Sequence, residues 1–149
     1  MSWRVVLASV VALAVAGCLG SSESLKKLQT QAGRVCTRGL DASALIQPPA
    51  IPAATTKFLR RGISVLGPEL ADLRRLRAPS DNADAYSAAL GALARELTIL
   101  TVTAHDLDRG ADPLTTIKTL QHRLAPVEAA GEAAWRTLDV PACVTAGGM

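Results

Sequence analysis

The stretch that decides the fold is YSAALGALARELTILTVTAHDL, residues 86–107. Apolar side chains recur in it at alternating steps of three and four residues. An α-helix makes one turn in about 3.6 residues, so this spacing gathers the apolar side chains on one face of a helix. The predicted face consists of Tyr86, Leu90, Leu93, Leu97, Leu100, Ala104 and Leu107.

Three further stretches of the 149-residue chain show the same spacing, and no stretch alternates apolar and polar residues as a strand does. Proline and glycine separate the stretches, since neither residue favours the interior of a helix. Helices are therefore predicted over residues 22–44, 53–77, 81–109 and 113–138. Because the connections are short, neighbouring helices must be antiparallel. The prediction is an all-α protein, an antiparallel up-down-up-down four-helix bundle.

Pro68 and Pro126 lie inside the second and fourth predicted helices. Each removes a backbone hydrogen bond, so both helices are predicted to be kinked, at nearly the same height. Two interpretations stay open. The kinks are tolerated in a filled core, or they widen the core into a small pocket for a lipid or another apolar ligand. The candidate pocket residues are Ala32, Leu66, Leu93, Leu97 and Val127.

The beginning of the chain has a different composition from the rest. Arg4 supplies one positive charge, and eleven of the next twelve residues are apolar. This apolar segment is shorter than the ~20 residues that span a membrane, so residues 1–17 are predicted to be a secretory signal peptide. The sequence Val-Ala-Gly-Cys at residues 15–18 resembles the lipobox of bacterial lipoproteins.

The resemblance implies that cleavage precedes Cys18 and that this cysteine carries diacylglycerol and becomes the acylated N-terminus. Several acyl chains anchor a protein durably, because each buried CH₂ group contributes ~0.8 kcal/mol. The implied location is the outer face of the bacterial cell membrane or the periplasmic side of an outer membrane. Residues 18–21 then form a lipidated tether, residues 22–143 one helical domain and residues 144–149 a flexible tail. In composition, residues 19–149 resemble small helical lipoproteins of high-GC bacteria.

Two cysteines remain, Cys36 and Cys143, and an even pair in an exported chain favours a disulfide. In a simple bundle the fourth helix ends level with the start of the first, well below Cys36. Since the two Cα atoms must come within ~7 Å, either residues 139–143 run back along the bundle or residues 21–34 project below it as a stalk. The returning tail is favoured, because Leu25 and Leu28 need cover.

The sequence contains no recognisable catalytic or metal-binding motif. His105 and His122 differ in predicted height and lack metal-ligand spacing, so both are expected at the surface or its boundary. Glu128 and Glu132 lie one helical turn apart and are expected to be solvated. No enzyme activity, cofactor or metal is predicted.

Charge and aromatic content exclude one class of partner. The net charge is only +3, and past residue 17 the aromatic residues are Phe58, Tyr86 and Trp135, which disfavours nucleic-acid binding. The predicted second helix is basic and the third acidic, which is typical of complementary solvated faces. The alternative is a contact with anionic lipid through a basic end, defined as Arg74, Arg75 and Arg77.

The expected function follows from the anchor and from the lack of a catalytic constellation. The leading hypothesis is a non-catalytic, lipid-anchored cell-envelope protein that binds another, unknown envelope component through its surface. The alternative hypothesis is a carrier or sensor of a small apolar ligand in the mid-bundle pocket. An exposed apolar patch would favour the first, and an enclosed cavity would favour the second.

Overall fold

The computed structural model describes residues 19–144, with side chains from residue 24 onward. The predicted signal peptide, Cys18 and residues 145–149 lie outside the described residues. The elements in chain order are α1 (Leu19–Ala44), η1 (Pro52–Ala54), α2 (Thr55–Arg74), η2 (Ser80–Asn82), α3 (Ala83–Asp108), α4 (Pro113–Thr137) and α5 (Pro141–Val144).

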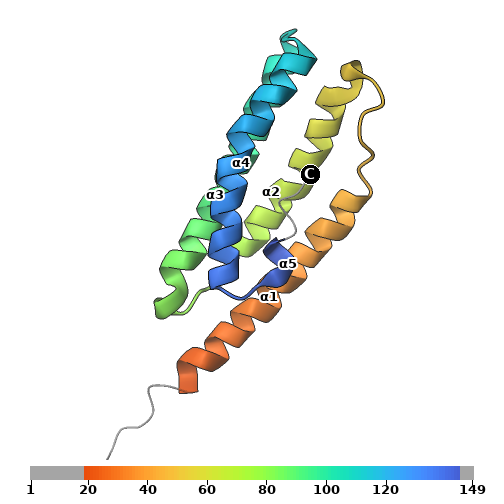
Figure 1. The fold of residues 1–149 in the computed structure, drawn as a ribbon. Coiled ribbons are helices and arrows are strands. Elements are labelled where there is room, and N and C mark those ends of the chain that lie inside the picture. Colours follow the sequence, from red (N-terminus) through yellow and green to blue (C-terminus); the bar gives the residue numbers. More distant parts are fainter. Residues whose placement is uncertain (1–18, 145–149) are drawn as a thin grey trace, which may run out of the picture.

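Four long helices pack in sequence order, α1 on α2, α2 on α3 and α3 on α4, with neighbours antiparallel (Figure 1). Residues 19–144 contain no strand. The predicted all-helical bundle is confirmed. Helices α2 and α4 run through Pro68 and Pro126 without interruption.

The helix boundaries differ from the predicted ones by only a few residues, for local reasons. Helix α1 begins at Leu19, so residues 19–21, which the sequence assigned to a tether, are helical. Helices α2 and α3 each follow a short 3₁₀ turn that begins at or after a proline. Helix α4 begins where Pro113 follows Asp112, whose carboxylate accepts a hydrogen bond of 2.8 Å from the amide of Thr115.

Helices α3 and α4 form the most extensive helix pair, because small residues let their backbones approach. A Cβ atom on Gly131 would lie 3.1 Å from the Cβ of Ala92, so any larger residue there would require a small shift of α3 or α4. The segment Ser80–Asp108, which includes α3, is long and apolar enough to cross a membrane. The core helix of a soluble bundle meets the same criterion.

The tail after α4 returns along the bundle, as Figure 1 shows for α5 beside α1. Asp139 adopts a positive φ of 54° at the reversal. The return brings Cys143 to Cys36, and the two form a disulfide with their Cα atoms 5.1 Å apart. Leu28 is buried beneath this tail. The disulfide and the returning tail are therefore confirmed, although the first turns of α1 extend past the ends of the other helices (Figure 1).

Two groups of buried apolar side chains make up the core. The disulfide cluster lies toward the end where α1 begins, and all four long helices and the tail contribute to it. Its members are Leu28, Ala32, Val35, Cys36, Leu73, Tyr86, Ala89, Ala134, Trp135, Leu138, Val140 and Cys143. The aliphatic cluster lies toward the other end, and only α2, α3 and α4 contribute to it. Its members are Leu59, Leu66, Ile99, Leu100, Ala104 and Leu120.

Candidate functional site

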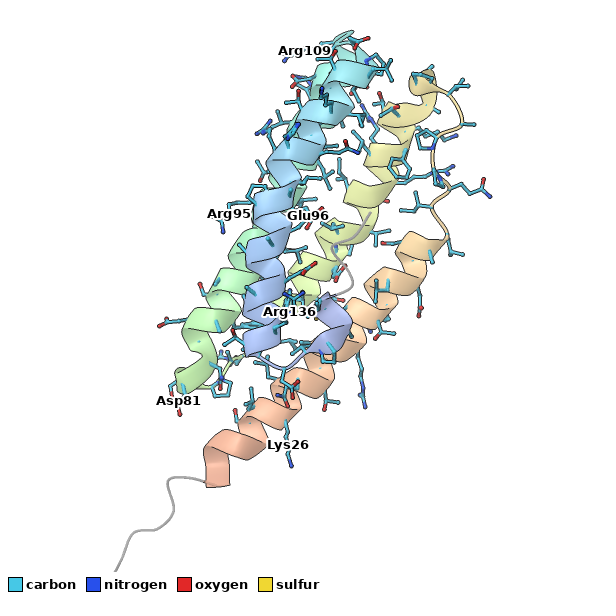
Figure 2. The ribbon with its side chains drawn as sticks, viewed as in Figure 1. Lys26, Asp81, Arg95, Glu96, Arg109 and Arg136 are labelled. Atoms are coloured by element: carbon cyan, nitrogen blue, oxygen red, sulfur yellow. A yellow bond between two sulfur atoms is a disulfide. The ribbon has the colours of Figure 1, made fainter. Side chains whose placement is uncertain are left out.

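Two glutamates are buried at the boundary between these clusters. Glu69 of α2 is 8% exposed and Glu96 of α3 is 7% exposed. Along α2, Glu69 lies between Leu66 of the aliphatic cluster and Leu73 of the disulfide cluster. Figure 2 shows Glu96 between α4 and α2. The two carboxyl groups thus belong to the middle layer of the bundle.

The helical repeat itself directs both glutamates inward. Glu69 stands three residues after Leu66 and four before Leu73, and all three are buried. On α3, the steps from Ala92 to Glu96 and on to Ile99 are four and three residues. Neither glutamate was expected in the core, because the predicted stripes contain only apolar residues. Testing whether a charged residue completes the spacing would have found them.

Glu69 and Glu96 line a cavity of about 40 Å³ among α2, α3 and α4, which the Cys36–Cys143 disulfide also borders. Since one water needs roughly 10–15 Å³ of such volume, about three waters fit. Glu128 and Glu132 of α4 line the same cavity, as does the indole of Trp135. The cavity therefore combines apolar walls with four carboxyl groups.

Burial changes the ionisation of these groups. Desolvation raises the pKa of Glu69 from 4.5 to about 7. Desolvation also raises the pKa of Glu96 to about 7, and the negative charges of Glu128 and then Glu69 add to the effect. Among the described residues, no cationic side chain forms an ion pair with Glu69 or Glu96. Both carboxyl groups therefore exchange protons near neutral pH.

Helix α1 covers Glu69 on its outer side. A Cβ on Gly39 would overlap the carboxyl group of Glu69, so the absence of a side chain allows this contact. Glu69 also lines a groove of about 230 Å³ between α1 and α2. Arg38 lines the groove too, but its guanidinium pairs with Asp72 at 3.3 Å. The Glu69 carboxyl thus separates the inner cavity from the surface groove.

Three of the five candidate pocket residues line one cavity, and the other two do not. Leu66, Leu93 and Val127 line the cavity. Ala32 packs in the disulfide cluster, and Leu97 packs against the aliphatic cluster. The cavity that they share with the glutamates is smaller and more polar than the apolar pocket that the sequence suggested.

Glu128 and Glu132 are less exposed than the sequence predicts. Both are half-buried, because the close approach of α3 and α4 places them at the edge of the cavity. Desolvation and the neighbouring Glu132 raise the pKa of Glu128. Glu132 accepts a hydrogen bond of 2.6 Å from Arg136. His105 and His122 are exposed, as expected.

The basic end is exposed at the close of α2 and in the following turn. Arg75 pairs with Asp72 at 2.8 Å, so part of its charge is compensated within the protein. Near the start of α2, Arg60 pairs with Asp108 of α3. This pair agrees with the expected complementarity between the two helices.

Three large apolar side chains are exposed around the α1–α2 connection and at the start of α4. Leu45 is 81% exposed, Ile51 is 61% exposed and Leu114 is 72% exposed. Leu45 and Ile51 belong to the α1–α2 connection, and Leu114 belongs to the first turn of α4. Turn η1, which directly follows Ile51, contacts α4. Figure 1 shows α1 ending about halfway along the bundle, so Leu45 lies apart from the end where α2 and α4 begin. We call Ile51 and Leu114 the distal apolar surface.

The described residues contain no group of three or more His, Cys, Asp or Glu side chains arranged to hold a metal ion. Comparison of the chain with protein-family models, with curated proteins and with solved structures finds no match. Function must therefore be inferred from the chain's own geometry.

Proposed function

We propose that the protein is a non-catalytic binding protein of the bacterial cell envelope, anchored by lipid at Cys18. It presents the distal apolar surface to a protein partner. The supporting observation is the exposure of Ile51, directly before η1, and of Leu114, in the first turn of α4. Both α2 and α4 begin at the end of the bundle farthest from the start of α1 (Figure 1). Exposed apolar side chains that gather at one place are typical of protein-binding surfaces.

The position of α1 supports the proposed arrangement at the membrane. Helix α1 begins at Leu19, directly after the proposed lipid-bearing cysteine, and Lys26 lies near this end of the bundle (Figure 2). The anchor and the distal apolar surface are then at opposite ends of a bundle whose long helices have 20 to 26 residues. A helix of that length spans roughly 30–40 Å, which holds the surface clear of the bilayer.

A carrier or sensor of an apolar ligand is less well supported by the cavity. A volume of about 40 Å³ is small against the roughly 300–1,000 Å³ of ligand pockets. In addition, Glu69 and Glu96 would lose hydration without gaining a partner if an apolar molecule replaced water. Binding through the surface is therefore the proposed function.

Site-specific photocrosslinking in the cells that produce the protein tests the proposed partner. A photoreactive amino acid replaces Ile51 or Leu114, and a control replaces Arg95, which is exposed on α3. We expect positions 51 and 114 to yield the same adduct and position 95 to yield none. No adduct from the two distal positions, or the same adduct from all three, would contradict the proposal.

Metabolic labelling with a tagged fatty acid tests the anchor separately. We expect the full chain to be labelled and to sediment with membranes. The Cys18→Ser variant should lose both properties. A chain that is labelled equally with and without Cys18 would contradict the proposed attachment site.

A further inference from the structure

The second half of α1 buries little against the rest of the bundle. From residue 37 to residue 44, Gly39 is the one buried residue. No residue of this segment belongs to either apolar cluster. The first half, by contrast, contributes Leu28 and Ala32 to the disulfide cluster and ends in the disulfide at Cys36. We call residues 37–44 the α1 flap.

We propose that Glu69 and Glu96 form a proton-operated switch that controls the packing of the α1 flap on α2. When both groups are protonated, the flap lies on α2 and Gly39 covers Glu69. When the groups lose their protons, the flap separates from α2 and water reaches the carboxylates through the α1–α2 groove. The disulfide keeps the first half of α1 in place, so the motion ends near Cys36.

The charges that face these carboxyl groups favour this response. Helix α4 presents Glu128 and Glu132, which are also acidic. The cations that lie nearby are already paired, because Arg136 binds Glu132 and Arg38 of the flap binds Asp72. Once ionised, Glu69 and Glu96 therefore face further negative charge, and the described cations nearby are already paired. Hydration is then the main interaction that stabilises the two carboxylates.

Opening the α1 flap admits water to the carboxylates at a smaller cost in free energy than opening any other helix pair. Opening between α3 and α4 would break the most extensive helix pair and expose Ala92 and Gly131. Opening the flap exposes little apolar surface, because Gly39 is its one buried residue and has no side chain. The Glu69 carboxyl already reaches the groove beneath the flap. Ionisation should therefore act on the flap before it acts on the other helices.

The direction of the response follows from proton linkage. The closed form holds the proton of Glu69 up to about pH 7, whereas an open form with a solvated carboxyl releases it near 4.5. Between these values the closed form binds more protons, so a rise in pH favours opening. The opening equilibrium then changes by about tenfold per pH unit for each carboxyl group that becomes solvated.

Hydrogen–deuterium exchange of the full chain with its disulfide tests the switch. Exchange is measured at about pH 5 and about pH 8 and corrected for the intrinsic rate at each pH. The test variant is Glu69→Gln/Glu96→Gln, which keeps the shape of both side chains and removes their charge. The matched control is Asp41→Asn, because Asp41 is an exposed carboxylate on the flap itself. Far-ultraviolet circular dichroism at both pH values shows whether the helices as a whole remain folded.

We expect the flap of the wild-type chain to lose protection by about tenfold or more at the higher pH. Residues 28–36 should keep their protection, and Asp41→Asn should behave like the wild type. The double glutamine variant should show equal flap protection at both pH values. Unchanged protection in the wild type, or the same loss in the double variant, would overturn the proposal. A uniform loss over all four helices would overturn it as well, because it would mean global unfolding.

Discussion

The disulfide cluster and the aliphatic cluster are both well buried, but different interactions hold them. The disulfide cluster contains a covalent link, the edge-to-face pair Tyr86–Trp135 with ring centroids 5.9 Å apart, and a contribution from every long helix. The buried members of the aliphatic cluster are leucine, isoleucine and alanine from three helices. Helix α1 therefore stabilises one end of the bundle and adds little to the other.

Because the two clusters are held differently, the residues of the layer between them determine how well the two halves of the bundle are joined. Glu69 and Glu96 lie where the contribution of α1 ends, so the ionisable groups are placed between the stronger and the weaker half. A layer of leucine at these positions would join both clusters into one core. Carboxyl groups there make the connection between the halves depend on pH, since a buried charge without a partner is costly.

Among substitutions, the largest expected loss of stability comes from removing the disulfide. The Cys36→Ala/Cys143→Ala variant should lose about 4 kcal/mol of unfolding free energy, because the bond closes a loop of more than a hundred residues in the unfolded chain. Urea unfolding of this variant, and of the wild-type chain with and without a reductant, measures the loss. A change below about 1 kcal/mol would mean that packing alone holds the tail on α1.

Leucine-to-alanine substitutions compare the two halves directly. Leu73→Ala and Leu100→Ala should each cost about 3 kcal/mol at acidic pH, because both side chains are almost fully buried. Leu73 lines the cavity and Leu100 does not. Leu73→Ala should therefore also admit water to the carboxyl groups and flatten the dependence of stability on pH. Equal pH dependence in both variants, measured by urea unfolding, would contradict this role of the cavity.

A smaller effect is expected for Tyr86→Phe. The hydroxyl of Tyr86 donates a hydrogen bond of 2.6 Å to the carbonyl oxygen of Leu73, inside the disulfide cluster. Its removal should cost about 1 kcal/mol, because the carbonyl group loses a buried partner. Thermal unfolding measures the loss, which should be the same in the oxidised and the reduced protein. No measurable change would mean that water replaces the hydroxyl.

The smallest effect is expected at the membrane. Conversion of the basic end to serine should weaken retention on anionic liposomes, and salt should weaken retention of the wild-type chain in the same way. Arg75 contributes less than the other two arginines if its pair with Asp72 persists. The matched control converts three other exposed cations to serine, at the other end of α2 and on α4: Lys57, Arg61 and Lys118. If this control loses as much retention as the variant of the basic end, a specific contact is excluded.

The sequence predicts the helices and their order well, because each helix carries a complete apolar stripe with proline or glycine near its ends. It also predicts the pairing of Cys36 with Cys143, because an even pair of cysteines in an exported chain favours a disulfide, and the structure confirms this pairing. The carboxyl layer was not predicted. A glutamate is ordinarily solvated, so a stripe drawn from apolar residues alone omits Glu69 and Glu96, although both stand at the spacing of buried positions.

The distal apolar surface also escapes prediction from periodicity. Ile51 belongs to a connection between helices, and Leu114 lies outside the apolar stripe of α4. Their exposure depends on how the α1–α2 connection and the start of α4 are arranged. Single apolar residues in a sequence therefore indicate binding only after the fold has shown that they share one end of the molecule.

The most direct test of the ionisable middle layer is the free energy of unfolding as a function of pH. Between pH 4.5 and about 7 the folded protein holds protons that the unfolded chain has released, so stability should fall as pH rises. The expected loss is on the order of 3 kcal/mol for each buried carboxyl group. Glu69→Gln/Glu96→Gln should be nearly independent of pH in this range. A wild-type protein that is most stable above pH 7, or a double variant that loses as much stability as the wild type, would contradict the account.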